Sequence, residues 1–315
     1  MTSLDRCKWL LPVLCLWITG QLTAAEYWVS PNGNDANAGT RESPWQTLQK
    51  AAARAAPGDT VFLRAGIYGE TLRPAKSGEA DKPIRFVGAP GERPILSGAD
   101  ALTGAWQPHQ GRVYKLQTDL KFIQLFVDGK MMPEARWPNT PPGELMTYNR
   151  AAAGEGTGYE VLADKNLPPG DWNGGIVLLW PGSRWVSITR RISDYQPAQS
   201  LRFDPTTEQT VKDKYHATDP YKPRAGNPYV LMGSLAGLDS PGEWFLDEKN
   251  GTVYLWTLDS QSPATHTVAV KQRDYAADFG KRSFVELKGV NVLGAGVNMA
   301  DAQGCVLEDC RLRYV

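Results

Sequence analysis

Alternating apolar and polar positions recur near both ends of the chain. The segments 60–64 and 83–87 are short strand patterns, and they align at a spacing of 23 residues. Four later apolar positions reappear at a spacing of 20: Val285, Leu287, Val290 and Val292 match Cys305, Leu307, Cys310 and Leu312. One coil of a parallel β-helix stacks its inward residues on their counterparts one period later. The two spacings therefore predict stacked β-helix coils at both ends of the chain.

A short amphipathic helix is predicted just ahead of the first of these strands. Ser43 is a good N-cap, Pro44 fits the first helical position, and Gln46 completes a reciprocal capping box. The apolar face that follows consists of Leu48, Ala51, Ala52 and Ala55. Pro57 and Gly58 end the pattern. Because the terminal coil of a solenoid would otherwise expose its core, we interpret this helix as the N-terminal cap.

Between the two β-helix segments the pattern changes to longer alternating strands separated by Pro and Gly loops. Its clearest unit is a hairpin, in which segments 244–246 and 253–256 flank the turn dipeptide Asn250-Gly251. We expect an inserted β-sandwich at 105–280. The predicted organisation is a signal peptide at 1–25, a cap with the first coils at 26–104, the insertion, and resumed coils at 281–315.

The first 25 residues have the three zones of a secretory signal. A polar start carries Arg6 and Lys8, an apolar run follows from Trp9 to Ile18, and small residues end at Ala25, where we expect cleavage. The apolar run is shorter than the roughly 20 residues that a membrane-spanning helix needs, so no membrane span is predicted. The expected location of the mature protein is secreted or periplasmic.

Charge and cysteine content narrow the classes of partner. The chain has 34 Lys and Arg residues against 34 Asp and Glu residues. This balance argues against a nucleic-acid partner, which would require a basic surface. After signal cleavage only Cys305 and Cys310 remain, too few for a disulfide framework. We expect both thiols to stack inward in the core as small apolar groups.

No standard catalytic or metal-binding motif is present. The three histidines, His109, His216 and His266, lie far apart, and we expect each to be a solvated or hydrogen-bonded loop residue. Asp35 resembles the start of a calcium loop, but Gln46 occupies the position of the required bidentate glutamate. A turn is the better interpretation. No metal and no cofactor are predicted.

Three carboxylates near the end of the sequence leave two interpretations open. Asp301, Glu308 and Asp309 could form an acid and nucleophile pair on the outer face of the coils, as glycoside hydrolysis requires. Charged residues beside strands are more often solvated turn residues, and we favour that alternative. The catalytic residues stay unknown at this level.

Three segments resemble known carbohydrate-active proteins. The first is the opening Tyr27–Asp35 with Pro44-Trp45; the others are 125–139 and 242–255, with the motifs LFVDGK, ARWPN, GEWFLD and GTVYL. The opening resembles the initial segment of secreted right-handed β-helix proteins. The other two resemble the sandwich inserted in β-helix glycoside hydrolase families that contain β-xylosidases and α-fucosidase or xylanase members. The resemblance implies an all-β fold: a right-handed parallel β-helix, pectin-lyase-like, with an N-terminal capping helix and an inserted β-sandwich.

The same resemblance implies what the site contains. In those families the catalytic aspartate and glutamate lie on coils after the inserted domain, so the resemblance implies that they follow Val315. The strand pattern at 311–315 stops without a polar capping repeat, so we expect an N-terminal fragment that is inactive by itself. Arg136, Trp137 and Asn139 are the residues that we nominate for substrate contact, because a guanidinium and an indole suit sugar hydroxyls and rings. Their alternative role is to hold the sandwich against the β-helix.

Three functions remain open from the sequence. The leading hypothesis is a glycoside hydrolase acting on plant or microbial polysaccharide or oligosaccharide, with a carboxylate pair at the scissile bond. A calcium-assisted polysaccharide lyase is the first alternative, and a non-catalytic surface or adhesion protein is the second. Sugar, linkage and oligomeric state are not encoded in these patterns.

Overall fold

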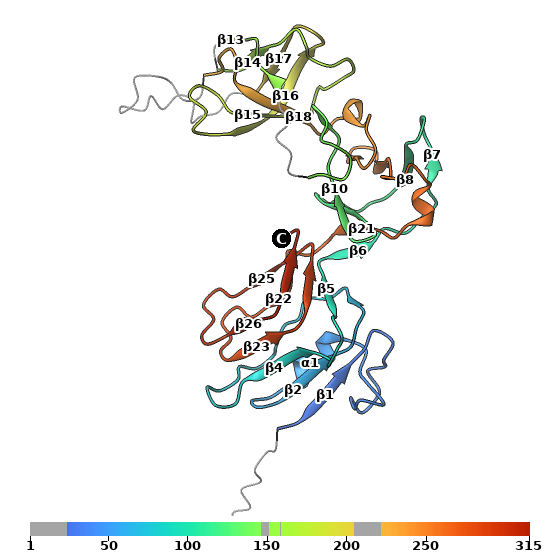
Figure 1. The fold of residues 1–315 in the computed structure, drawn as a ribbon, viewed down its shortest axis with the longest axis vertical. Helices are drawn as coiled ribbons and strands as arrows, with labels where there is room; N and C mark the ends of the chain where they lie inside the picture. The colour runs from blue at the N-terminus through green and yellow to red at the C-terminus, as the bar shows by residue number, and fades with distance from the viewer. Residues whose placement is uncertain (1–23, 146–150, 158, 205–221) are drawn as a thin grey trace, which may run out of the picture.

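The computed structural model describes residues 24–145, 151–157, 159–204 and 222–315. The predicted signal peptide therefore lies outside the described residues. Figure 1 shows an elongated molecule with a β-helix at one end, an antiparallel β region beside it, and a second β body at the far end. Among the described residues, no helix combines the length and apolar character needed to cross a bilayer.

Parallel strands from both ends of the sequence build the β-helix. The main sheet has the order β1 (Glu26–Val29), β2 (Thr60–Leu63), β4 (Ile84–Gly88), β23 (Val285–Lys288) and β26 (Val306–Glu308). A second sheet contains β3 (Ile67–Tyr68), β5 (Ile95–Ser97), β24 (Asn291–Leu293) and β27 (Arg311–Arg313), and β22 (Tyr275–Asp278) pairs with β25 (Gly296–Asn298). Coils formed before and after the insertion thus join in the same sheets (Figure 1).

The strand registers confirm one predicted spacing and correct the other. Leu287 pairs with Leu307 and Val292 with Leu312, which confirms the spacing of 20. The earlier pair was wrong by two residues, because Thr60 pairs with Arg85 instead of Pro83. Proline has no N–H to donate to a ladder. A shift of two residues keeps every side chain on its own face, so the alternation alone could not detect the error.

Inward side chains fill the β-helix as the alternation predicted. Val61, Phe86 and Leu287 are fully buried in one cluster that spans coils on both sides of the insertion. Cys305 and Cys310 are free thiols packed against the same cluster, which confirms that they act as small core residues. At the last described strands, Val306 and Leu312 are each 39% exposed.

The capping helix is present, but it begins later than predicted. Helix α1 runs from Leu48 to Arg54, and Thr47 is its N-cap, accepting a hydrogen bond from the N–H of Lys50. The residues before it continue along β1 instead, because Trp45 is buried and its N–H donates to the carbonyl of Trp28. The predicted N-cap, Ser43, is therefore wrong. The apolar face is confirmed: Leu48, Ala51, Ala52 and Ala55 are all buried.

Asp35 fixes the start of this helix. Its carboxylate accepts hydrogen bonds from the Thr47 hydroxyl at 2.6 Å and from the N–H groups of Gln46 and Thr47 at 2.8 and 3.0 Å. Although burial raises the pKa of Asp35, these hydrogen bonds and Lys50 bring it below its ordinary value. The residue that resembled the start of a calcium loop is thus a helix-positioning carboxylate.

The insertion is nested. The chain leaves the β-helix after β5 and forms a sandwich of two four-stranded antiparallel sheets around a shared core. One sheet contains β6 (Ala99–Ala101), β9 (Leu125–Val127), β10 (Lys130–Met132) and β21 (Val268–Lys271); the other contains β7 (Gln107–Pro108), β8 (Tyr114–Gln117), β19 (Trp244–Asp247) and β20 (Thr252–Leu255). The predicted hairpin is β19 and β20, paired around Asn250-Gly251. Both ends of the insertion lie nearer the N-terminus than the predicted 105 and 280.

A second β body interrupts the sandwich between β10 and β19. Its strands are β11 (Arg136–Trp137), β12 (Ala151–Ala152), β13 (Glu155–Thr157), β14 (Val161–Ala163), β15 (Ile176–Leu179), β16 (Ile188–Gln196), β17 (Ser200–Phe203) and β18 (Pro228–Met232). They form an antiparallel eight-stranded sheet around a core of their own, with Trp172 and Tyr229 fully buried. The sequence patterns predicted one inserted unit, because alternation looks the same in both.

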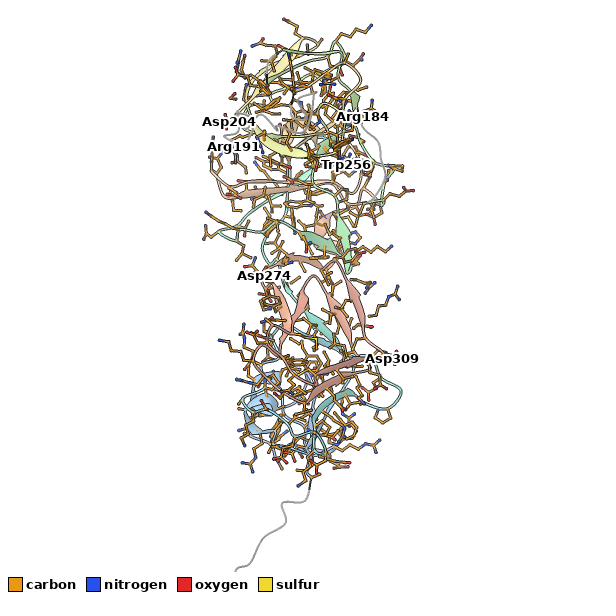
Figure 2. The ribbon with its side chains drawn as sticks, turned by 90° about the vertical axis from the view of Figure 1, so that its left-hand side faces the viewer. Arg184, Arg191, Asp204, Trp256, Asp274 and Asp309 are labelled. Atoms are coloured by element: carbon orange, nitrogen blue, oxygen red, sulfur yellow. The ribbon has the colours of Figure 1, made fainter. Side chains whose placement is uncertain are left out.

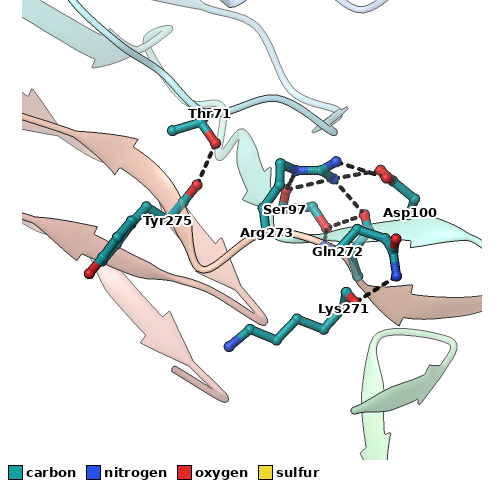
Figure 3. Close-up of polar contacts among 8 residues, drawn as sticks. Thr71, Ser97, Asp100, Lys271, Gln272, Arg273 and Tyr275 are labelled. Atoms are coloured by element: carbon teal, nitrogen blue, oxygen red, sulfur yellow. Dashed lines mark hydrogen bonds and ion pairs between the residues drawn. The ribbon is translucent and has the colours of Figure 1, made fainter. Parts of the chain in front are cut away.

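Arg273 ties the exit and the return of the insertion together (Figure 3). Its two terminal nitrogens bind the two carboxylate oxygens of Asp100 at 2.5 and 2.8 Å, and its side chain also donates to the carbonyls of Ser97 and Ala99. The backbone at Gly98 completes the joint, since its carbonyl accepts the N–H groups of Gln272 and Arg273. A Cβ on Gly98 would lie 2.5 Å from the carbonyl oxygen of Gly294, so only glycine fits.

We expect Arg273→Lys to loosen this joint. Lysine keeps the charge but lacks the planar fork that binds both oxygens of Asp100, so part of the network is lost. Amide hydrogen exchange at 97–101 and 271–275 should accelerate by about tenfold. The matched control is Arg202→Lys, because Arg202 pairs with Glu160 on an exposed surface of the second β body. Equal exchange rates in wild type and Arg273→Lys would contradict the role.

Candidate functional site

The three residues nominated for substrate contact lie on one short stretch at the start of the second β body. Arg136 and Trp137 form β11, which pairs antiparallel with β18 through Met232 and Leu231. The Trp137 ring packs against the core of this body, 5.9 Å from the ring of Tyr229. The structure thus places the contacts of Trp137 within the insertion.

Polar contacts join this stretch to the loop before β19. The side chain of Asn139 donates to Asp239 at 2.7 Å, and Arg136 donates through Nε to the carbonyl of Pro138 at 3.0 Å. All three nominated residues are half-buried. The arrangement brings a guanidinium, an amide and a carboxylate together beside an indole, which are the groups that hydrogen-bond sugar hydroxyls and pack against sugar rings.

Glu243 lies beside Arg136 and Asp239, and sequence reasoning did not identify it as a candidate site residue. Its side chain is 1% exposed, although it stands in the quoted motif GEWFLD. Burial and the nearby Asp239 raise the pKa of Glu243 to about 8, against the lowering effect of the N–H groups of Ser240, Asp239 and Arg136. Glu134 lies on the segment before β11, and burial raises its pKa too. A sequence-level hint existed, because Glu243 directly precedes an apolar strand.

The raised pKa of Glu243 predicts a pH-dependent stability. The native state keeps this proton up to about pH 8, whereas the unfolded carboxyl loses it near the ordinary value of 4.5. The free energy of unfolding therefore falls as the pH rises through this window, because the native state binds the extra proton. Glu243→Gln cannot ionise, so it should be more stable than wild type at about pH 9 and similar to it at about pH 4.

Urea unfolding followed by tryptophan fluorescence at both pH values measures this difference. Glu248→Gln is the matched control, because Glu248 is exposed in the neighbouring hairpin. If Glu243→Gln and wild type keep the same difference in stability at both pH values, Glu243 does not titrate in the predicted window.

The three carboxylates near the end of the sequence lie in exposed ion pairs and turns. Glu308 binds Lys288 at 3.0 Å, and Asp309 binds Arg93 at 2.5 Å on the surface of the β-helix (Figure 2). Asp301 adopts a positive φ of 57° in a turn. These positions favour the solvated-turn interpretation over an acid and nucleophile pair.

The described histidines are held in loops. The Nδ1–H of His266 donates to the carboxylate of Asp128 at 2.8 Å, and its Nε2 lies 3.3 Å from Asp259. The hydrogen bond with Asp128 raises the pKa of His266. His109 packs edge-on against Tyr254, and His216 lies outside the described residues. Within the described part of the chain, no three His, Cys, Asp or Glu side chains are grouped so that they could hold a metal ion.

Comparison with known proteins supports the architecture. Residues 27–129 match the model of the Pel9A-like right-handed β-helix region. Over 87 residues, 28% of this chain, the sequence is 40% identical to the uncharacterized protein YwoF of Bacillus subtilis. Over 79 residues, 24% of the chain, it is 39% identical to the pectate lyase PEL9 of Emericella nidulans. Each match spans 19% of the relative's own length.

A solved structure described as a glycoside hydrolase covers much more of the chain. It superposes on 85% of this chain and 50% of its own, with a TM-score of 0.64 and 21% sequence identity. At that identity the likeness concerns the fold. The chain is therefore an all-β protein of the right-handed parallel β-helix class, as predicted. Its resemblance to carbohydrate-active β-helix proteins is also confirmed.

Proposed function

We propose that this protein is an exported glycoside hydrolase that acts on plant or microbial polysaccharide in a secreted or periplasmic location. The observation that carries the proposal is the architecture: a β-helix interrupted by a sandwich whose chain returns to the same parallel sheet, shared over 85% of the chain with a glycoside hydrolase structure. The signal-like start of the sequence supports export.

The proposed chemistry needs two carboxyl groups at the glycosidic bond. One protonates the leaving oxygen, and the other attacks the anomeric carbon or activates water. Glu308 and Asp309 are engaged by Lys288 and Arg93. In this proposal the pair therefore follows residue 315, on coils that stack on β26 and β27, as the resemblance implies. The described chain supplies the scaffold, and Arg136, Trp137 and Asn139 contribute sugar contacts.

A polysaccharide lyase is the second candidate. The observation in its favour is the local match of residues 27–129 to the Pel9A-like model and the 39% identity with a pectate lyase. A lyase would need a base to abstract the proton, and calcium to neutralise the uronate. Because the match covers only the first coils and part of the sandwich, it bears on the scaffold more than on the reaction.

The test uses the natural gene product, including whatever its reading frame encodes after Val315. We expect it to release aryl groups from a panel of aryl glycosides, while residues 26–315 alone release none. Products with unsaturated uronate that absorb in the ultraviolet would favour the lyase instead. Absence of both products from a folded protein would favour a surface or adhesion protein and contradict the hydrolase.

A further inference from the structure

The outer face of the main parallel sheet has two chemically different ends. Strand pairing aligns its outward residues in rows, and one row contains Trp28, Phe62, Val87, Lys288 and Glu308. Towards the β23 and β26 end of the sheet two cations, Lys288 and Arg85, balance two carboxylates, Glu286 and Glu308. Lys288 there binds Glu286 and Glu308 at 3.0 Å each. At the β1 end the row is aromatic, and the Trp28 and Phe62 rings stack with centroids 4.7 Å apart.

Two guanidinium groups lie over the Trp28 ring at this aromatic end. The central carbons of Arg41 and Arg64 are 5.4 and 5.3 Å from the ring centroid. Arg64 also donates to the backbone carbonyl of Arg41 at 2.9 Å, which holds the Arg64 side chain against the loop that carries Arg41. Stacking on an indole and this hydrogen bond pre-organise the cations without neutralising them.

Neither cation has a carboxylate partner within the described part of the chain. Other arginines of the same body do, since Arg85 pairs with Glu286 and Arg93 with Asp309. Glu92 lies beside Arg64, but its carboxylate accepts the N–H of Ala65 at 2.6 Å instead of forming an ion pair. The side chain of Arg41 is exposed and donates no hydrogen bond to any described residue.

A cleft opens beside these two cations. It has a volume of about 250 Å³ and is lined by Trp28, Phe62, Arg41, Arg64, Pro90 and Glu92, among others. Sites for drug-sized ligands begin at roughly 300 Å³, so this cleft suits one small ring. Two carboxylates, Glu26 and Glu92, also line the cleft, and Glu92 is occupied by the N–H of Ala65. The guanidinium groups of Arg41 and Arg64 can bind carboxylate or sulfate oxygens through paired hydrogen bonds.

We propose that this cleft is a binding subsite for an anionic sugar residue, whose carboxylate or sulfate group is held by Arg41 and Arg64 while its ring contacts Phe62 and Pro90. The inference rests on the proposed action on polysaccharide, and it adds that the chain recognised here is acidic. The subsite lies on the first two coils, on the outer face of β1 and β2. It is thus separate from the cluster around Arg136 in the insertion.

The test is a titration of the full chain by isothermal calorimetry with three probes of similar length. They are an oligogalacturonide, a sulfated oligosaccharide and a neutral xylo-oligosaccharide. We expect one or both anionic probes to bind and the neutral probe to bind at least tenfold more weakly, about the effect of one charged hydrogen bond. The two anionic arms show whether the group is a carboxylate or a sulfate.

Arg41→Gln should weaken binding of the anionic probe by about tenfold, because it removes the cation that has no other partner. Arg41→Lys keeps the positive charge but lacks the planar guanidinium, so its affinity for the anionic probe should lie between those of wild type and Arg41→Gln. Arg112→Gln is the matched control: Arg112 is exposed in the inserted sandwich, and this variant should bind as wild type does. An unchanged melting temperature in all three variants excludes misfolding.

Equal binding of neutral and anionic probes, or unchanged affinity in Arg41→Gln, would overturn the subsite. These results concern binding by the described chain, so they leave the test of the proposed hydrolase unaffected. Conversely, a gene product that binds the acidic probe through Arg41 but cleaves no glycoside would refute the hydrolase and retain the subsite.

Discussion

The return of the chain to its own sheet is the constraint on which this structure depends. Arg85 and Glu286 form an ion pair on adjacent strands although 201 positions separate them in sequence. The entropy cost of such a closure grows slowly with loop length, but the ends must meet in one exact register. The fork from Arg273 to Asp100 and the backbone contacts at Gly98 set that register. They fix the two crossing segments side by side.

The nested arrangement follows from the same joint. The segments that leave and re-enter the β-helix are held together at this joint. Directly beyond it, β6 and β21 pair with each other and start one sheet of the inserted sandwich. The sandwich is itself interrupted in the same way: the chain leaves it after β10, forms the second β body, and returns to it before β19. Each body has its own buried cluster. Every unit can therefore bury apolar surface without waiting for the others.

The fold could be predicted from the sequence as far as alternation specifies it. Inward positions such as Leu287 and Leu307 were identified because coil stacking repeats apolar residues at a fixed period. The start of the helix was missed because Asp35, distant in sequence, binds the N–H groups of Gln46 and Thr47 and competes with the local cap at Ser43. Helix propensity and capping patterns depend on neighbouring residues only, so they do not predict a hydrogen bond from another part of the fold.

The candidate site was less predictable than the fold. Arg136, Trp137 and Asn139 were nominated from a motif, and their substrate contacts stay a prediction. Glu243 was missed because its chemistry comes from burial, and burial depends on how the loop at Asp239 folds over it. A carboxyl that is 1% exposed looks the same in sequence as an exposed one. Only the packed structure separates the two.

Residues on the outer face of the β-helix are less constrained by folding than the inward residues. Inward positions must be apolar, whereas outward ones need only be compatible with water. On β23 and β26 these positions hold paired charges, Lys288 with Glu286 and Glu308. At the β1 and β2 end, Arg41 from the loop after β1 and Arg64, the residue after β2, lie over the Trp28 indole. Both cations lie near the same ring, and a bound anion would offset their positive charge. This offset of charge is the physical basis of the proposed anionic subsite.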